Sequence, residues 1–333
     1  MLQTSTPRAA LALAAALLAA CAHDPGPPSD PALLEGLPPT GRDPLFETAH
    51  PGPGYQDLRP HTHYEQGSAE DPEVGPDGQS LYFASTHDTR DFNIYVKGVD
   101  SPAVTRLTAS PGNERQPRVS PDGKFLAYVG DETGHWEIYL LALGTGEPPQ
   151  RVHSGPGDKY GPAWRVDGRA LVYCSRSEQT GTYQLWTLDL DSGLARDFDA
   201  RISGLFPKYS PQSDWIVFHK WKERDLGYAS LWRIRPDGTE PTVILTQPEW
   251  GSITPVWSPD GKRIAFSAVA KSLERHGVGF RSDDIWTVGA DGSALTQVTA
   301  DPASDWAPSW HGNRIYFVSD RSGTPNIWSL PVR

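Results

Sequence analysis

The sequence predicts an all-β protein, a six-bladed β-propeller with four-stranded blades. Three observations predict it. A proline recurs six times at a spacing near 45 residues, an aliphatic–aromatic pair follows each proline, and a second such pair follows the first. A period of this length with several short strands per repeat is typical of propeller blades.

The three features keep their register along the whole repeat region. The prolines are separated by 45, 45, 45, 48 and 53 positions, by subtraction of their numbers: Pro72, Pro117, Pro162, Pro207, Pro255 and Pro308. The first pairs are Leu81/Phe83, Leu126/Tyr128, Leu171/Tyr173, Ile216/Phe218, Ile264/Phe266 and Ile315/Phe317. The second pairs are Ile94/Tyr95, Ile138/Tyr139, Leu185/Trp186, Leu231/Trp232, Ile285/Trp286 and Ile327/Trp328.

The second repeat shows why each unit folds into strands. Ser120-Pro-Asp-Gly123 has turn chemistry, because proline pre-sets φ, aspartate bonds nearby backbone and glycine accepts a positive φ. The apolar and aromatic run 125–129 suits a buried strand. We expect four strands, a to d, near residues 118–120, 125–129, 138–143 and 151–152 of this repeat.

The ring needs one strand from outside the repeats. Five outer d strands can be found for six units, because Arg333 follows soon after the last c strand. Residues 59–64 precede Pro72 at the distance at which the d strands precede the other prolines. We therefore expect this segment to complete the last blade, and Pro60 is tolerable on an outer edge strand.

The N-terminal residues have the features of a targeting segment. Arg8 precedes an apolar run at 9–17, and Leu18-Ala-Ala-Cys21 resembles the lipobox of bacterial lipoproteins, in which the cysteine is lipidated. The alternative is an ordinary cleavable signal with a cysteine nearby. We predict a lipoprotein signal peptide at 1–20, a Pro/Gly-rich tether at 21–58 and the propeller at 59–333.

Composition limits the possible partners. The net charge is −11 and the pI about 5.3. Nucleic acid and anionic lipid are bound by basic patches, so the sequence argues against both and leaves the lipid anchor as the membrane contact.

The chain has two cysteines. With Cys21 lipidated, Cys174 has no cysteine for an intrachain disulfide, and its strand position predicts an inert buried thiol.

The repeats resemble the WD-like repeats of TolB-type β-propellers. The residues that carry the resemblance are Pro255-Val-Trp-Ser-Pro-Asp-Gly261, Ser319-Asp-Arg-Ser-Gly323 and Ile327-Trp328, and the similarity covers about 59–333. It implies a propeller in the bacterial cell envelope with a protein partner, such as a peptidoglycan-associated lipoprotein. The chain differs from TolB in having a tether where TolB has an α/β domain, and in its lipobox.

One face of the ring is the candidate binding face. The d–a and b–c connections open there, and the distance between the two pairs rises from 10–12 positions to 13 in unit four and 19 in unit five. Aromatic and basic side chains around a concave mouth suit an acidic partner or a glycan, and the alternative is a solvated loop with a structural tryptophan. The candidate residues are Tyr160, Lys220, Lys222, Arg224, Trp250, Arg275, His276, Arg281 and Trp306; the unit-five loop also carries Lys271.

The sequence indicates a binding protein rather than an enzyme. It contains no Gly-x-Ser-x-Gly elbow, no His-Glu-x-x-His and no phosphate loop, and we predict no catalytic residue and no cofactor. His61 and His63 lie on one face of a strand, but nothing nearby supplies a third ligand, so we predict no metal site.

We therefore expect a lipid-anchored binding or scaffolding module, on the periplasmic side of the outer membrane or at the cell surface. Two alternatives stay open: a propeller enzyme acting on carbohydrate or peptide, and a sensor of a small ligand or cation in the channel. A cluster of His, Asp and Glu with raised pKa values at the channel mouth would favour catalysis.

Overall fold

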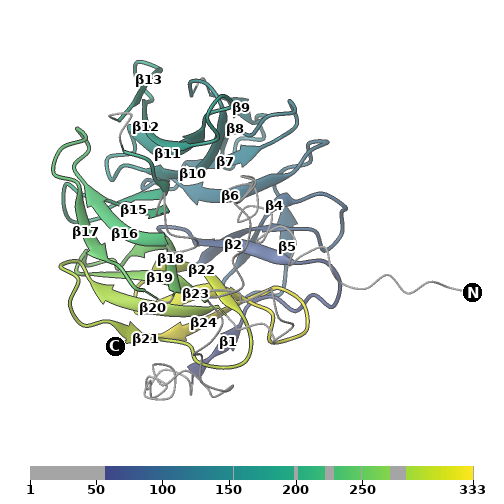
Figure 1. Cartoon of the computed structure of the whole chain (residues 1–333). Helices are drawn as coiled ribbons and strands as arrows, with labels where there is room; N and C mark the ends of the chain where they lie inside the picture. Colours follow the sequence, from purple (N-terminus) through teal and green to yellow (C-terminus); the bar gives the residue numbers. More distant parts are fainter. Residues whose placement is uncertain are drawn as a thin grey trace, which may run out of the picture. The chain divides into compact units, whose positions relative to one another are not determined.

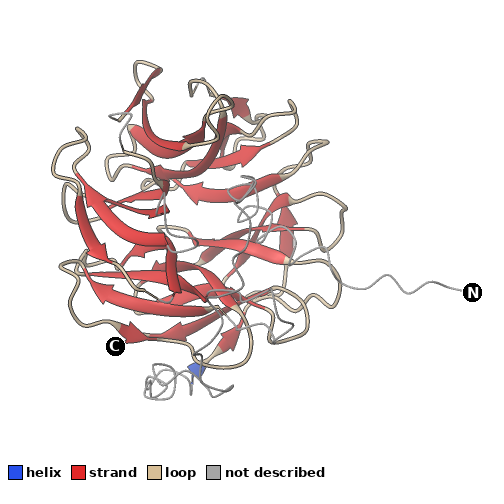
Figure 2. Cartoon of the chain, in the orientation of Figure 1, coloured by secondary structure: helices blue, strands red, loops and turns tan. Residues whose placement is uncertain are grey.

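The computed structural model describes residues 57–152, 154–198, 202–221, 229–248, 250–270 and 283–332. Six four-stranded antiparallel sheets follow one another around a central axis (Figure 1). The described residues form strands and turns without a long helix (Figure 2), and they contain no helix long and apolar enough to cross a membrane. The six-bladed propeller predicted from the repeats is confirmed.

Each blade contributes its strands in the order a to d from the axis outward. The first and second blades are β2 (Ala69–Val74), β3 (Ser80–Ser85), β4 (Asn93–Gly98), β5 (Val104–Arg106), and β6 (Glu114–Val119), β7 (Phe125–Gly130), β8 (Glu137–Ala142), β9 (Gln150–Arg151). The third and fourth are β10 (Asp158–Trp164), β11 (Ala170–Arg176), β12 (Tyr183–Asp189), β13 (Leu194–Asp197), and β14 (Leu205–Tyr209), β15 (Ile216–Trp221), β16 (Ala229–Ile234), β17 (Thr242–Leu245). The fifth and sixth are β18 (Trp250–Trp257), β19 (Arg263–Ala270), β20 (Asp284–Gly289), β21 (Thr296–Gln297), and β22 (Asp305–His311), β23 (Arg314–Ser319), β24 (Asn326–Pro331), β1 (Arg59–Pro60).

The N-terminal strand closes the ring, as expected from the missing outer strand. β1 pairs antiparallel with β24, with Arg59 opposite Ser329 and Pro60 opposite Trp328. The closure continues past β1, since the N–H of His61 donates to the carbonyl of Ile327 at 2.8 Å. The Thr62 hydroxyl then donates to the Asn326 side-chain oxygen at 2.8 Å. Residues 59–64 therefore join the beginning of the propeller to its end.

A β-bulge interrupts the innermost strand of every blade at the recurring proline. The residue before each proline has a positive φ, between 49° and 62°: Asp71, Gln116, Gly161, Phe206, Thr254 and Ala307. In the first blade the register shifts between Glu70 and Glu73. Proline has no N–H to give to a ladder, so an interruption of the ladder is where a strand tolerates it. The proline column thus marks six equivalent bulges around the axis.

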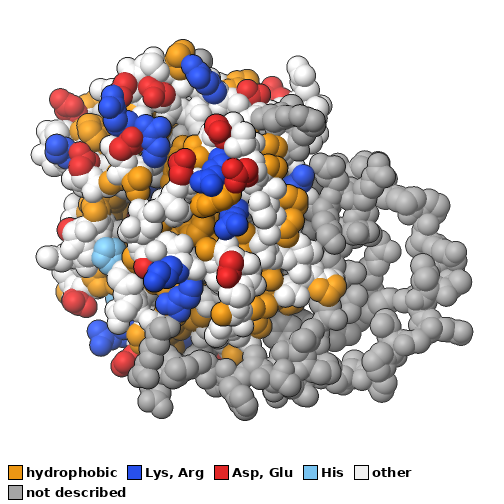
Figure 3. Space-filling view, turned by 90° about the vertical axis from the view of Figure 1, so that its left-hand side faces the viewer, with side chains coloured by type: hydrophobic (Ala, Val, Ile, Leu, Met, Phe, Trp, Pro, Cys, Tyr) orange, Lys and Arg blue, Asp and Glu red, His pale blue; other side chains and the backbone are white. Residues whose placement is uncertain are grey.

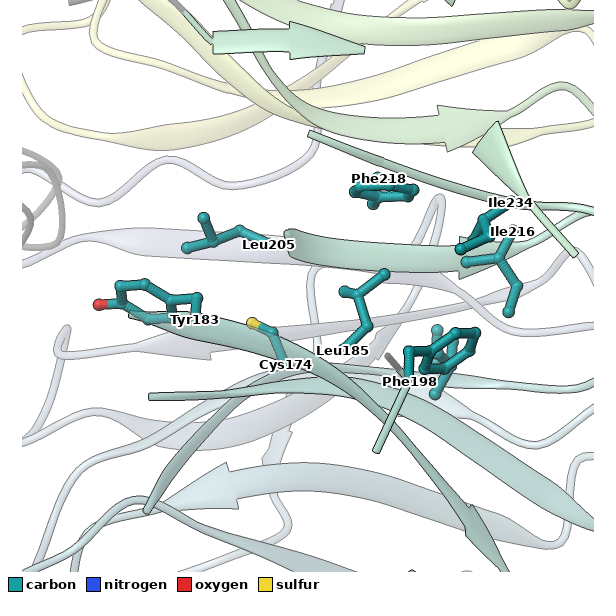
Figure 4. Close-up of a cluster of buried hydrophobic side chains, with 10 residues drawn as sticks. Cys174, Tyr183, Leu185, Phe198, Leu205, Ile216, Phe218 and Ile234 are labelled. Carbon is teal, nitrogen blue, oxygen red and sulfur yellow. The ribbon is translucent and has the colours of Figure 1, made fainter. Parts of the chain in front are cut away.

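The hydrophobic core lies between neighbouring blades. Every residue of the predicted first pairs, from Leu81/Phe83 to Ile315/Phe317, is buried. Figure 4 shows one such layer, in which Cys174 and Leu185 of the third blade face Leu205 and Phe218 of the fourth. The predicted buried position of Cys174 is confirmed, and its thiol lies 3.3 Å from the carbonyl oxygen of Tyr160.

Candidate binding face and axial channel

The beginnings of the c strand and of the next a strand meet at one face of the ring. The backbone N–H near the start of an a strand donates to a carbonyl at, or just before, the start of the preceding blade's c strand. This bond recurs as Glu114 to Phe92, Lys159 to Trp136, Gly204 to Tyr183, Asp305 to Asp283 and Ala69 to Pro325, at 2.7–3.1 Å. Where the donor residue has a side chain, the bond sets it beside the first side chains of the c strand, as at Lys159 and Asp305.

At the boundary of the second and third blades, these two side chains form a buried ion pair. Lys159 Nζ lies 2.9 Å from Glu137 Oε2, and the side chain of Lys159 is 2% exposed. At the boundary of the fifth and sixth blades, the equivalent residues are Asp284 and Asp305, exposed by 5% and 0%. The same backbone position therefore holds opposite charges at one boundary and two carboxyl groups at the other.

We call the boundary of the fifth and sixth blades, which contains Asp284 and Asp305, the acidic boundary. Its two carboxyl groups accept hydrogen bonds from different residues. Asp305 accepts from Arg321 Nη2 at 2.8 Å with each oxygen. Asp284 accepts from Gln297 Nε2 at 3.1 Å and from the Thr299 hydroxyl at 3.2 Å. Only Asp305 therefore has a cation as its direct neighbour in these contacts.

Burial changes the acidity of this group. It raises the pKa of Asp284 to about 8, with the nearby charge of Asp305 adding to the effect. It also raises the pKa of Asp283 to about 7, helped by Asp320 and Asp305. For Asp305, burial raises the pKa to about 6, while Arg321 opposes the rise. These carboxyl groups gain and lose protons near neutral pH.

A relay of side chains crosses from blade to blade beside the axis. Arg115 of the second blade donates to Asp71 at 3.0 Å and to Glu70 at 2.5 Å, both in the first blade. The N–H of Gln116 donates to Asp71 at 3.2 Å, and the Gln116 side-chain oxygen accepts from the N–H of Gly161 at 2.6 Å. The bulge N–H groups of the second and third blades are thus satisfied by the bulge side chains of the blades before them.

Two positions further along the innermost strands lies a second set of equivalent residues. These are the residues that follow the recurring prolines: Glu73, Arg118, Ala163, Lys208, Val256 and Ser309. Arg118 Nη1 lies 3.7 Å from Glu73 Oε2, and the Ser309 hydroxyl lies 3.5 Å from the same oxygen. Three consecutive blades are therefore linked through Glu73.

Comparison with known proteins assigns this arrangement of blades to a family. Residues 57–246, more than half of the 333, match the family model of the TolB beta propeller domain. The chain belongs to this family. The match spans the closing strand and the first four blades, and the fifth and sixth blades complete the same ring in the structure.

Curated relatives share the TolB-like propeller region with this chain. An uncharacterized protein of Agrobacterium fabrum is 29% identical over 202 residues, which are 59% of this chain and 64% of that protein. The Tol-Pal system protein TolB of Francisella tularensis subsp. tularensis is 26% identical over 202 residues, 60% of this chain and 46% of that protein. The matched region is therefore less than two thirds of the length of either relative.

Solved structures share the fold of this TolB-like propeller. TolB from Acinetobacter baumannii superposes with a TM-score of 0.55 at 18% identity, over 80% of this chain and 64% of that one. Oligogalacturonate lyase from Vibrio parahaemolyticus superposes with a TM-score of 0.57 at 16% identity, over 83% and 93%. At these identities the likeness concerns the fold alone.

The structure places four of the predicted face residues of the TolB-like domain. Tyr160 and Trp306 are partly exposed near the beginnings of β10 and β22. Lys220 is also partly exposed, and its Nζ lies 5.6 Å from the ring centre of Trp232. Trp250 is 5% exposed and stacks on Phe266 and Trp286, so its side chain offers little surface to a partner.

The other predicted residues lie outside the described part of the chain: Cys21, Lys222, Arg224, Arg275, His276 and Arg281. Sequence reasoning missed the aromatic neighbours of Tyr160, whose ring centre lies 6.0 Å from those of Trp136 and Tyr183. It also missed the acidic boundary and the charged residues of the innermost strands.

The histidines considered for metal binding differ in their surroundings. His61 is buried, with Nε2 2.7 Å from the Ser329 hydroxyl and Nδ1 3.1 Å from the carbonyl of Val99, while His63 is exposed. No group of three or more His, Cys, Asp or Glu that could hold a metal occurs among the described residues. His61 thus acts in closing the ring, because both of its nitrogens are in contact with other parts of the chain.

Proposed function

We propose that this chain is a lipid-anchored binding module of the bacterial cell envelope. The family match carries the proposal, since the relative named for the Tol-Pal system shares the propeller region. The lipobox at Leu18–Cys21 and the Pro/Gly-rich stretch 21–58 support an anchor and a tether. The tether would let the propeller reach partners away from the membrane.

The proposed contact surface is the face where the d–a and b–c connections open. Tyr160 and Trp306 supply partly exposed aromatic rings there, and aromatic residues dominate the energetics of many protein interfaces. The basic residues Lys222, Arg224, Arg275, His276 and Arg281 belong to the connections of the same face. A protein of the envelope, such as a peptidoglycan-associated lipoprotein, is the proposed partner, and a glycan is the alternative.

The surface of the propeller is mixed in charge despite the net charge of −11. Figure 3 shows Lys and Arg side chains interspersed with Asp and Glu and with apolar groups on one side of the molecule. Such a surface suits a specific protein contact better than a general attraction to polyanions.

The enzyme alternative has one observation in its favour, the near-neutral pKa values of Asp283, Asp284 and Asp305. Two of these carboxyl groups are buried and engaged by Gln297, Thr299 or Arg321 rather than open to a substrate. This arrangement favours a structural role, and binding remains the better-supported function.

Direct binding to a purified peptidoglycan-associated lipoprotein tests the proposal. The whole chain carrying Cys21→Ser is used as a soluble bait, beside a variant that adds Arg275→Ala, Arg281→Ala and Trp306→Ala. The matched control instead adds Lys124→Ala and Val166→Ala, which are exposed residues of the a–b turns at the opposite ends of the strands. We expect stoichiometric binding that the face variant loses and the control keeps. No binding to this partner or to solubilised envelope proteins would reject a protein partner, and the same baits would then be tested against purified glycans.

Fractionation tests the anchor separately. Cys21→Ser should move the protein from washed membranes to the soluble fraction. Persistence of that variant in the membrane fraction would reject lipid anchoring and leave the binding test unaffected.

A further inference from the structure

A polar cavity lies where the b–c and d–a connections of the first blade meet. Its volume is about 160 Å³, which is several times the space that one water molecule needs. Residues 86–92 join β3 to β4 and residues 107–113 join β5 to β6, so the cavity is on the candidate binding face. Six of its seven lining residues are polar or charged: Thr89, Arg90, Asp91, Asn93, Arg106 and Ser110. Such a lining suits a small polar ligand.

Asn93 fixes the wall that the b–c connection contributes to this cavity. It is 4% exposed, and its Nδ2 donates to the Thr89 hydroxyl at 3.1 Å and to the carbonyl of Asp91 at 3.0 Å. The Thr89 hydroxyl donates to the same carbonyl at 2.8 Å. Because three hydrogen bonds hold this short segment, the wall is in place before a ligand binds, and such preorganisation lowers the cost of binding.

Two guanidinium groups at the cavity have no counter-charge. Arg90 and Arg106 are exposed and form no hydrogen bond or ion pair with other described residues. Asp91 is the one acid among the described residues that line the cavity, so the lining carries two positive charges and one negative charge. The balance is positive although the net charge of the chain is −11. A monoanion therefore complements the cavity, and a cation is disfavoured.

The first and fifth blades correspond residue by residue at this place. The N–H of Ile94 donates to the Thr108 hydroxyl at 2.9 Å, and the N–H of Ile285 donates to the Thr299 hydroxyl at 2.9 Å. β4 begins one residue before Ile94, and β20 begins one residue before Ile285. Counted from these bonds, three lining residues have equivalents in the fifth blade: Asn93 and Asp284, Arg106 and Gln297, Ser110 and Asp301.

In the fifth blade, the protein itself supplies carboxyl groups at these positions. Gln297 Nε2 donates to Asp284 Oδ2 at 3.1 Å, and Asp301 Oδ2 lies 2.9 Å from Arg321 Nη2. In the first blade, an amide and a hydroxyl replace the two carboxyl groups, and an arginine replaces the glutamine. The first blade therefore has the stronger donor and lacks the carboxyl groups that its equivalent holds.

We propose that this cavity binds the carboxylate group of a ligand through Arg90 and Arg106. A guanidinium group binds a carboxylate through two parallel hydrogen bonds, which are stronger than those of neutral donors. The ligand carboxylate takes the place that the fifth blade fills with its own carboxyl groups. It can come from a free small acid or from the C-terminus of a peptide. The inference depends neither on the lipid anchor nor on the protein partner proposed above.

Thermal unfolding of the whole chain with Cys21→Ser tests this site. Sodium acetate, titrated to about 100 mM, should raise Tm by about 2 °C or more relative to sodium chloride at equal ionic strength. Anions also act on protein surfaces in general, so the effect assigned to the cavity is the part that Arg106→Gln removes. A cavity effect of sodium phosphate as large as that of acetate would overturn the assignment to a carboxylate.

The deciding variant is Arg106→Gln, which introduces the residue type of the equivalent position in the fifth blade. The matched control is Arg151→Gln. Arg151 is exposed and lies opposite Tyr139 in the second blade, as Arg106 lies opposite Tyr95 in the first, but it does not line the cavity. We expect Arg106→Gln to lose the acetate effect and Arg151→Gln to keep it. No acetate effect in the parent, or equal effects in the parent and Arg106→Gln, would overturn the proposal.

A second variant supplies the carboxylate from within the chain. Ser110→Asp introduces the residue type of Asp301 at the equivalent position, and its carboxylate should pair with a guanidinium group of the cavity. This variant should therefore lose the acetate effect with both arginines present, and an undiminished effect would contradict the proposal.

Two peptides separate the sources of the carboxylate. A larger effect of a tripeptide with a free C-terminus, lost in its C-terminal amide, would assign the carboxylate to a peptide. An effect of acetate without one of the tripeptide would assign it to a free small acid.

Discussion

The boundary between the second and third blades and the boundary between the fifth and sixth use the same backbone bond. The backbone N–H of Lys159 donates to the carbonyl of Trp136 at 2.9 Å, and the backbone N–H of Asp305 donates to the carbonyl of Asp283 at 2.7 Å. The first boundary adds the Glu137–Lys159 ion pair, and the second adds Asp284 beside Asp305. The fold tolerates either arrangement because backbone bonds and apolar packing position the blades, while the side chains decide how each boundary responds to pH.

The largest effect is expected from breaking the ion pair. Glu137→Ala leaves the ammonium group of Lys159 buried without its carboxylate, and breaking a buried pair from one side costs about 3–5 kcal/mol. Urea unfolding monitored by tryptophan fluorescence measures the loss.

The control replaces both partners, with Glu137→Leu and Lys159→Met in one chain. Exchanging a buried pair for apolar residues of similar size is often neutral or stabilising. A double variant that unfolds as easily as Glu137→Ala would contradict the assigned cause, because it carries no unpaired ammonium group at this boundary.

The second effect is expected at the acidic boundary and depends on pH. The pKa of Asp284 is raised to about 8, whereas an unfolded aspartate titrates near 3.9. Between these values the folded chain keeps a proton that the unfolded chain has lost, so the free energy of unfolding falls as pH rises from about 4 to about 8. Asp284→Asn removes this dependence and should stabilise the protein by at least about 1 kcal/mol at pH 8, by less at pH 5, and by progressively less as the pH approaches 4.

Urea unfolding at pH 5, 7 and 9 measures the difference. Asp291→Asn is the matched control, since Asp291 lies in an exposed turn whose hydrogen bonds from Ser293 lower its pKa. A stabilisation by Asp284→Asn that is the same at all three pH values would contradict the assigned cause.

The sequence predicted the parts of the fold that repeat with the same residue types. Turn residues such as Asp122-Gly123 and the apolar pairs recur in most blades, so their period predicts the number of blades. The absence of a sixth d strand after the last c strand predicts that the N-terminal segment closes the ring. The bulge was not predicted, because its residues Asp71, Gln116 and Phe206 share no chemistry. The signal of each bulge in the sequence is the proline beside it, because proline has no N–H to give to the ladder.

The charged sites escaped prediction for a different reason. Asp284 and Asp305 are distant in sequence and belong to different blades, so no local motif joins them. An alignment of the repeats would have shown that Asp284 stands at the position of Glu137 and Asp305 at the position of Lys159. The same comparison sets Lys208 against Ala163 and Val256. Burial and contacts, which decide what these charges do, come from the structure.

The smallest effect is expected where an ion pair is exposed, and it separates pairing from burial. Arg169 Nη2 lies 2.5 Å from Asp191 Oδ2, with side chains 65% and 56% exposed. Water screens such a pair, so Asp191→Asn should cost between 0 and about 1 kcal/mol and less at high salt. The same urea unfolding, with and without 1 M sodium chloride, compares it with Glu137→Ala, whose cost should change little with salt because Lys159 is buried. Similar costs for both variants would mean that burial does not set the strength of these pairs, and the contrast between the two blade boundaries would then need another cause.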